Sequence, residues 1–128
     1  MAHKEQFEFC SQVVNNNKRL FRNKKVLDCG SLDINGNNHH MFTDCEYIGI
    51  DVGEGKNVDV VSTIHEYPGK DGEFDVIVST ECAEHDMHWE ESLKNIVRMS
   101  VPLFFNVTHP LVVLVGVLIR LLFRFHYN

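Results

Sequence analysis

The sequence lacks the features that mark several common classes of protein. Its cysteines, Cys10, Cys29, Cys45 and Cys82, include no C-x-x-C pair, so neither a zinc knuckle nor a redox pair is predicted. The 12 basic residues stand against 18 acidic ones, which gives a net charge of −6. Without a basic excess the chain has no stripe to neutralise a nucleic-acid backbone, and we expect no nucleic-acid partner. Unpaired cysteines favour a reducing compartment, and we expect the cytoplasm.

Long apolar runs are scarce as well. The uninterrupted run at residues 111–119 has nine residues, whereas a membrane-spanning helix needs about 20. Residues 101–125 nevertheless contain no acid. This stretch is open to three interpretations: a fifth buried strand, an interfacial membrane anchor, or sequence never selected to fold here. A chain of 128 residues holds one domain at most. We therefore place a folded domain at residues 1–100 and a divergent apolar tail at residues 101–128.

What is present is a series of short apolar runs separated by polar loops. Strands are predicted at residues 25–30, 47–52, 58–63 and 74–80. Three of these runs are almost continuously apolar rather than alternating, which is typical of parallel strands covered on both faces. The fold class is therefore α/β, a Rossmann-like, doubly wound and mostly parallel sheet.

Two helices are predicted to cover this sheet. Residues 4–22 carry a weak helical pattern that three consecutive asparagines interrupt. Residues 89–99 predict an amphipathic helix, and the side chains expected on its inward face are Trp89, Leu93, Ile96 and Val97.

The first two predicted strands end in residues that suit a nucleotide. Asp28 and Gly30 close the first strand, and Gly30 allows a tight turn in which backbone N–H groups can face a ligand. Asp51 closes the second strand about 20 residues later and can accept both hydroxyl hydrogens of a ribose. The polar stretch between them suits a ligand loop or a short, irregular helix. A dinucleotide oxidoreductase is disfavoured because G-x-G-x-x-G is absent.

The end of the fourth predicted strand adds further candidates. Ligands bind at the carboxyl ends of strands in open parallel sheets, so Ser79 and Glu81 are predicted to border the same pocket as Gly30. His85 is a candidate general base, with a structural or pocket-lining role as the alternative.

A metal site is the competing interpretation of this segment. On a helix one face would carry Glu81, Glu84, His85 and His88. A strand gives way to a helix here, so helical spacing is not assured and we predict no metal.

The order and spacing of these motifs resemble the class I S-adenosylmethionine-dependent methyltransferases, specifically the methyltransferase domain 11 group. The resemblance covers residues 23–99. The letters VLDCGS at 26–31 are similar to the cofactor loop of the family, and YIGID at 47–51 to its ribose-binding strand. The letters YPGKDGEFDVIVS at 67–79 resemble the stretch LPF-x-DGSFDVVxS. EH at 84–85 resembles xxEH, and NIVRM at 95–99 resembles the helix that leads into RxLKPGG.

The resemblance implies a cofactor, S-adenosyl-L-methionine, and an unidentified small-molecule or macromolecular methyl acceptor. It implies cofactor contacts from Asp28, Gly30 and Asp51, and the adjoining Ser31, Ser79 and Glu81 complete the predicted cofactor-binding set. The LKPGG motif and the later strands of the family are absent after Met99. We therefore expect an incomplete sheet in a C-terminally truncated or frameshifted copy. The alternatives are a non-catalytic, cofactor-binding remnant and a protein whose apolar tail contacts a membrane.

Overall fold

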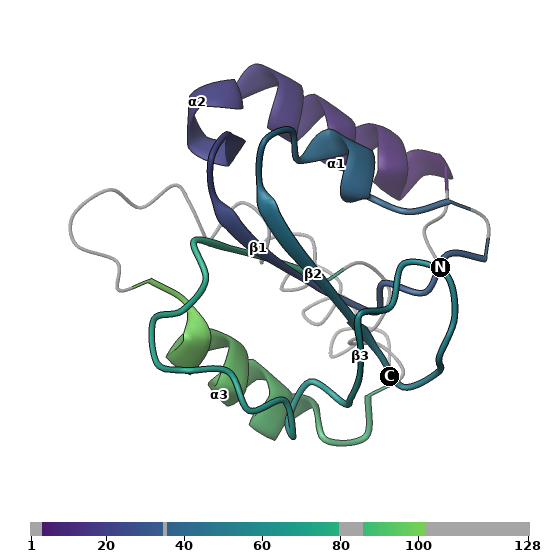
Figure 1. Ribbon diagram of the computed structural model, residues 1–128, viewed down its shortest axis with the longest axis vertical. Helices are drawn as coiled ribbons and strands as arrows, with labels where there is room; N and C mark the ends of the chain where they lie inside the picture. The colour runs from purple at the N-terminus through teal and green to yellow at the C-terminus, as the bar shows by residue number, and fades with distance from the viewer. Residues whose placement is uncertain (1–3, 35, 80–85, 102–128) are drawn as a thin grey trace, which may run out of the picture.

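The computed structural model describes residues 4–34, 36–79 and 86–101. Two helices precede the first strand, and one helix follows the last strand of this part of the chain (Figure 1). The elements in order are α1 (Lys4–Asn16), α2 (Lys18–Phe21), β1 (Lys25–Cys29), the 3-10 helix η1 (His39–Met41), β2 (Glu46–Asp51), β3 (Val60–Val61), β4 (Val76–Ser79) and α3 (Trp89–Met99).

The four strands form one parallel sheet in the order β3-β2-β1-β4. Leu27 of β1 lies between Ile48 of β2 and Ile77 of β4. The chain therefore runs outward from β1 through β2 to β3 and then crosses back to the other side of β1. This reversal next to β1 is the place where open α/β sheets bind ligands, at the carboxyl ends of the strands. The predicted α/β fold class is confirmed.

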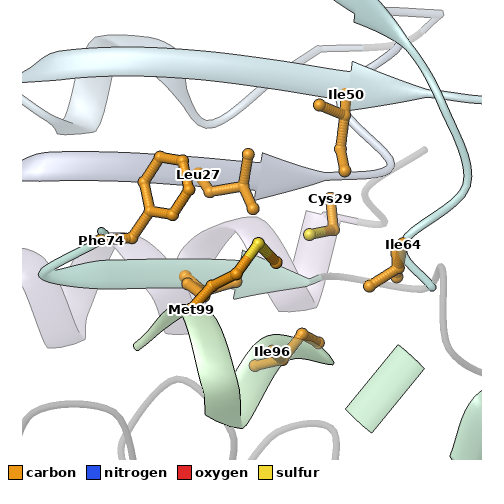
Figure 2. Close-up of a cluster of buried hydrophobic side chains, with 8 residues drawn as sticks. Leu27, Cys29, Ile50, Ile64, Phe74, Ile96 and Met99 are labelled. Atoms are coloured by element: carbon orange, nitrogen blue, oxygen red, sulfur yellow. The ribbon is translucent and has the colours of Figure 1, made fainter. Parts of the chain in front are cut away.

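Both faces of the sheet are covered, as the apolar runs predict. Helices α1 and α2 lie over one face and α3 over the other (Figure 1). Figure 2 shows the cluster on the α3 face, where Leu27 and Ile50 of the sheet meet Ile96 and Met99 of α3. Because successive residues of a strand point to opposite faces, an alternating pattern would leave one face polar. The unbroken apolar runs here supply apolar side chains to both faces of the sheet.

The helix α3 has the predicted limits but a different buried face. Ile96 is 5% exposed and Met99 is fully buried, whereas Val97 is 62% exposed, so the prediction that Val97 faces inward is wrong. Ser92, Ile96 and Met99 stand at i, i+4 and i+7, which is one face of a helix, and this is the face that meets the sheet. Trp89 and Leu93 are half-buried.

Strand β3 is shorter than predicted. Only Val60 and Val61 pair with β2, at the edge of the sheet, and both side chains are exposed. On either side of them the segment still bonds to β2, since the Asp59 N–H donates to the Gly49 carbonyl and the Ser62 N–H to the Asp51 carbonyl. A very short edge strand presents few unpaired backbone groups to another chain.

The cysteines and the tail were also subjects of predictions from the sequence. Cys29 is buried in the sheet as predicted, and Cys10 and Cys45 are cysteines outside any disulfide. Cys82 and residues 102–128 lie outside the described residues, so the interpretations of the tail stay predictions. Within the described ranges, no helix has the length and apolar character needed to cross a membrane.

Candidate functional site

The turn after β1 depends on Gly30. Its φ of 82° lies in the left-handed region, where a residue without a Cβ is favoured. The turn brings the N–H groups of Gly30 and Ser31 to the carbonyl oxygen of Ile50 in β2, at 2.8 and 3.0 Å. The chain therefore leaves β1 folded against the end of β2, which places the two predicted ligand-binding strand ends side by side.

The backbone of this loop is bonded within the protein, in contrast to the prediction. After Gly30 and Ser31, the Leu32 N–H donates to the Asp51 carboxylate at 3.1 Å, and the Asp33 N–H donates to the Lys56 carbonyl at 3.0 Å. Four successive N–H groups thus have internal acceptors because the loop lies against the segment that follows β2. Side-chain atoms, rather than these N–H groups, are what the loop offers to a ligand.

Asp51 is held at the end of β2 by two backbone groups. One carboxylate oxygen accepts the Leu32 N–H, and the other accepts the Gly53 N–H at 3.0 Å. A carboxylate has about four acceptor positions, so positions for further donors remain on a half-buried side chain. The two amides fix the plane of the carboxylate before any ligand arrives. This arrangement suits recognition of a pair of neighbouring hydroxyl groups.

Asp28 is a buried acid on the α1 face of the sheet, with 2% of its surface exposed. Its Oδ2 accepts a hydrogen bond from the hydroxyl of Tyr47, while its Oδ1 is buried and has no hydrogen-bond partner within residues 4–34, 36–79 and 86–101. Burial raises the pKa of Asp28 to about 6, and the Tyr47 hydroxyl opposes that shift. Burial and the nearby Asp28 carboxylate raise the pKa of Tyr47, which therefore remains a neutral donor.

Two serines add buried oxygens at the same edge of the sheet. Ser31 follows Gly30, and Ser79 ends β4 opposite Cys29 of β1. The Oγ atoms of Ser31 and Ser79 are buried and have no hydrogen-bond partner among the described residues. Buried polar groups are nearly always bonded, because an unmade bond costs about 1–3 kcal/mol. A ligand or an ordered water is therefore expected to complete them.

Asn57 is a residue of this site that the sequence reasoning missed. It has a left-handed φ of 67°, a conformation that asparagine tolerates better than most residues. Its side-chain nitrogen donates to the Ser31 carbonyl at 2.9 Å and to the Tyr47 hydroxyl at 3.0 Å. Gly49 makes room for this approach, since a Cβ there would lie 2.6 Å from Ser31 Oγ. The only signal in the sequence was an asparagine in a glycine-rich turn.

The remaining candidates from the sequence belong to the segment between β4 and α3. Glu81, Glu84 and His85 are not among the described residues. His88 is described and lies just before α3, with its ring 4.4 Å from that of His65. Across residues 4–34, 36–79 and 86–101, no group of three or more potential ligands is placed to hold a metal ion.

Solved structures with the same fold include methyltransferases. One is the 1,6-didemethyltoxoflavin-N1-methyltransferase of Burkholderia thailandensis, solved with 1,6-didemethyltoxoflavin and S-adenosylhomocysteine bound. It is 20% identical, with a TM-score of 0.60 over 75% of this chain and 48% of its own. Another is an S-adenosylmethionine-dependent methyltransferase from Aquifex aeolicus, which is 18% identical, with a TM-score of 0.52 over 72% of this chain and 58% of its own.

These likenesses bear on the fold. At such identities they show that the described part of the chain has the fold of S-adenosylmethionine-dependent methyltransferases, in agreement with the resemblance seen in the sequence. The chain spans about half the length of these proteins. No family model and no curated protein sequence matches it.

Proposed function

We propose that this chain binds S-adenosyl-L-methionine and serves as a methyltransferase domain that acts on an unidentified acceptor. The observation that carries the proposal is the geometry of Asp51. Its carboxylate ends β2 beside the Gly30 turn and is oriented by the N–H groups of Leu32 and Gly53. An acid in that position is suited to the two hydroxyl groups of a ribose.

The residues present fit the remainder of the cofactor. We assign the ribose to Asp51 and the close approach of the cofactor to Gly30. Asp28 Oδ1 and the hydroxyls of Ser31 and Ser79 are buried without partners in the part of the chain that the structure describes, and they are our candidates for contacts to the polar groups of the amino-acid end. A neighbouring structure that holds S-adenosylhomocysteine supports this choice of ligand. Glu81 remains a proposed contact on the strength of the sequence alone.

Methyl transfer depends more on how the reactants are positioned than on reactive side chains of the protein. When bound, the cofactor would supply a methyl group on a sulfonium, whose C–S bond breaks as the acceptor's lone pair attacks the carbon. The described residues would hold the ribose and the amino-acid end in one orientation, and such positioning is a large part of catalysis in bimolecular reactions. His85 stays a proposed general base for acceptors that must lose a proton.

A non-catalytic, cofactor-binding role is the alternative. The observation that favours it is the loop after β1, where four successive N–H groups already have acceptors within the protein. A loop closed in this way offers fewer contacts to the cofactor. We propose residues 1–100 as the binding domain under either function, with residues 101–128 as a separate tail.

Calorimetric titration with S-adenosylhomocysteine tests the proposed function. We expect saturable binding by the wild-type chain and no detectable binding by Asp51→Ala. The matched control is Asp71→Ala, since Asp71 is an exposed acid paired with Arg98 and takes no part in the site. Absence of binding by a folded wild-type chain would refute the proposal, and equal loss in Asp71→Ala would remove Asp51 from it.

A transfer assay separates the two functions. The chain is incubated with methyl-labelled S-adenosylmethionine and panels of small-molecule amines, thiols, phenols and carboxylic acids. Labelled product that depends on Asp51 favours the enzyme. Tight cofactor binding without labelled product in any panel favours the non-catalytic role.

A further inference from the structure

Two loops meet at the carboxyl ends of β1 and β2. The first loop, residues 30–34, follows β1, and the second loop, residues 52–58, follows β2. They are joined by the Asp33 N–H to the Lys56 carbonyl and by an ion pair of 3.3 Å between Lys56 Nζ and Asp33 Oδ2. Lys56 is largely exposed, so this ion pair contributes little stability. The more protected link between the loops is made by Asn57.

The side chain of Asn57 makes three polar contacts at once. Its nitrogen donates to the Ser31 carbonyl in the first loop and to the Tyr47 hydroxyl in β2. Its Oδ1 lies 3.3 Å from Nδ1 of His39, which can act as a donor. Two acceptors on one side and a donor on the other fix which way the amide points. The ring of His39 also stacks on Tyr47, with centroids 4.0 Å apart.

Each acceptor of Asn57 leads to a residue of the proposed cofactor site. Ser31 lies between Gly30 and Leu32, and the Leu32 N–H orients the carboxylate of Asp51. Tyr47 donates its hydroxyl to the buried carboxylate of Asp28. We propose that Asn57 is a positioning residue that holds the first loop and Tyr47 in the geometry required for cofactor binding. This inference rests on the proposed function and identifies a residue outside the predicted site.

Two variants test it. Asn57→Gly keeps the left-handed backbone and removes all three contacts. Asn57→Asp keeps the size, the tolerance for positive φ and the acceptor oxygen, but has no donor for Ser31 and Tyr47. The control is Asn23→Gly, because Asn23 is a second asparagine with positive φ (56°), located between α2 and β1.

The first readout needs no ligand. Amide hydrogen exchange, followed by NMR, is measured for Leu32 in the first loop and for Leu27 in the core of β1. We expect exchange at Leu32 to accelerate about tenfold in both Asn57 variants, as the loss of a hydrogen bond allows, with exchange at Leu27 unchanged. A residue that only stabilised the whole fold would change both amides together.

The second readout is the affinity for S-adenosylhomocysteine, expected to fall about tenfold in both Asn57 variants and not in Asn23→Gly. Unchanged amide exchange at Leu32 overturns the positioning role. Equal acceleration of exchange at Leu27 and Leu32 in both Asn57 variants also overturns it, as does failure of both variants to fold. Accelerated exchange at Leu32 with unchanged affinity also overturns it. If the wild-type chain binds no S-adenosylhomocysteine, the proposed function fails, and exchange at Leu32 alone decides whether Asn57 holds the loop.

Discussion

Asp28 lowers the stability of the fold by its burial, and it is also a candidate for ligand binding. Its carboxyl is buried between the sheet and α1, where a charge is poorly solvated, and one of its oxygens has no hydrogen-bond partner among the residues that the structure describes. The structure keeps it nonetheless at the end of β1, beside the Gly30 turn. A cationic or hydrogen-bond-donating ligand would relieve part of this cost.

The raised pKa of Asp28 gives a pH dependence with a definite sign. The folded protein binds this proton up to about pH 6, whereas in the unfolded chain the group loses it near its ordinary value of 3.8. Between those values the folded state binds more protons, so the free energy of unfolding falls as pH rises. Through this carboxyl, the free energy of unfolding of the wild-type protein should fall by about 2 kcal/mol between pH 4 and pH 7, and Asp28→Asn should lack that fall. Urea unfolding of both proteins across this range measures it.

The comparison with Asp28→Asn isolates this carboxyl from others that titrate in the same range. Hydrogen bonds hold the pKa values of Asp33 and Glu73 below their usual range, and their contribution has the opposite sign because it is lost as pH falls. The contribution of Asp33 and Glu73 is the same in the wild-type protein and in Asp28→Asn, so it cancels in the difference between their free energies of unfolding. A difference that does not vary with pH would mean that Asp28 titrates at its ordinary value.

At the scale of elements, α3 is joined to the sheet by apolar and polar contacts. Ile96 and Met99 enter the core on the α3 face. Asn95 donates its side-chain N–H groups to the carbonyls of Ile64 and Tyr67, at 2.7 and 3.0 Å, which ties α3 to the segment after β3. The helix therefore orders a connection that has no regular structure of its own.

Neighbouring residues of α3 provide a matched pair of variants. We expect Ile96→Ala to lower the free energy of unfolding by about 3 kcal/mol, because it leaves a cavity in the core. We expect Val97→Ala, on the exposed side of the same helix, to change it by less than about 0.5 kcal/mol. Chemical denaturation of both variants measures the difference. Equal effects would mean that α3 does not present the Ile96 face to the sheet.

At the scale of the whole molecule, the parallel sheet gathers residues that are far apart in the sequence. Asp28, Asp51 and Ser79 stand at the carboxyl ends of three adjacent strands. Parallel strands place those ends on one edge, so a single ligand can contact all three. A ligand that does so favours the folded state of the entire sheet.

This coupling predicts stabilisation by the cofactor product. At a concentration of S-adenosylhomocysteine 100 times its Kd, the free energy of unfolding should rise by about 2.7 kcal/mol, and the midpoint of thermal unfolding should rise with it. Adenine, which lacks the ribose, should stabilise the wild-type protein less, and Asp51→Ala should show no rise with S-adenosylhomocysteine. A rise of the same size in Asp51→Ala would place the ligand elsewhere.

Much of this architecture could be predicted because the signals are local. The apolar runs, the glycine at residue 30 and the acids at residues 28 and 51 are properties of short segments, and they predicted the strands and the parallel arrangement. The inward face of α3 was predicted with Val97 in place of Met99. On a short helix, two possible inward faces can share most of their residues. The position of the sheet decides which of the two faces is buried.

The sequence by itself determined the α/β class, the order of the strands along the chain and the acids at their ends, since each follows from the residues of one segment. The tertiary structure decided where the loop N–H groups after Gly30 find acceptors, and it brought Asn57 to Ser31 and Tyr47. Those contacts join segments 10 to 26 residues apart. They depend on how β1 and β2 lie against each other, which no single segment specifies.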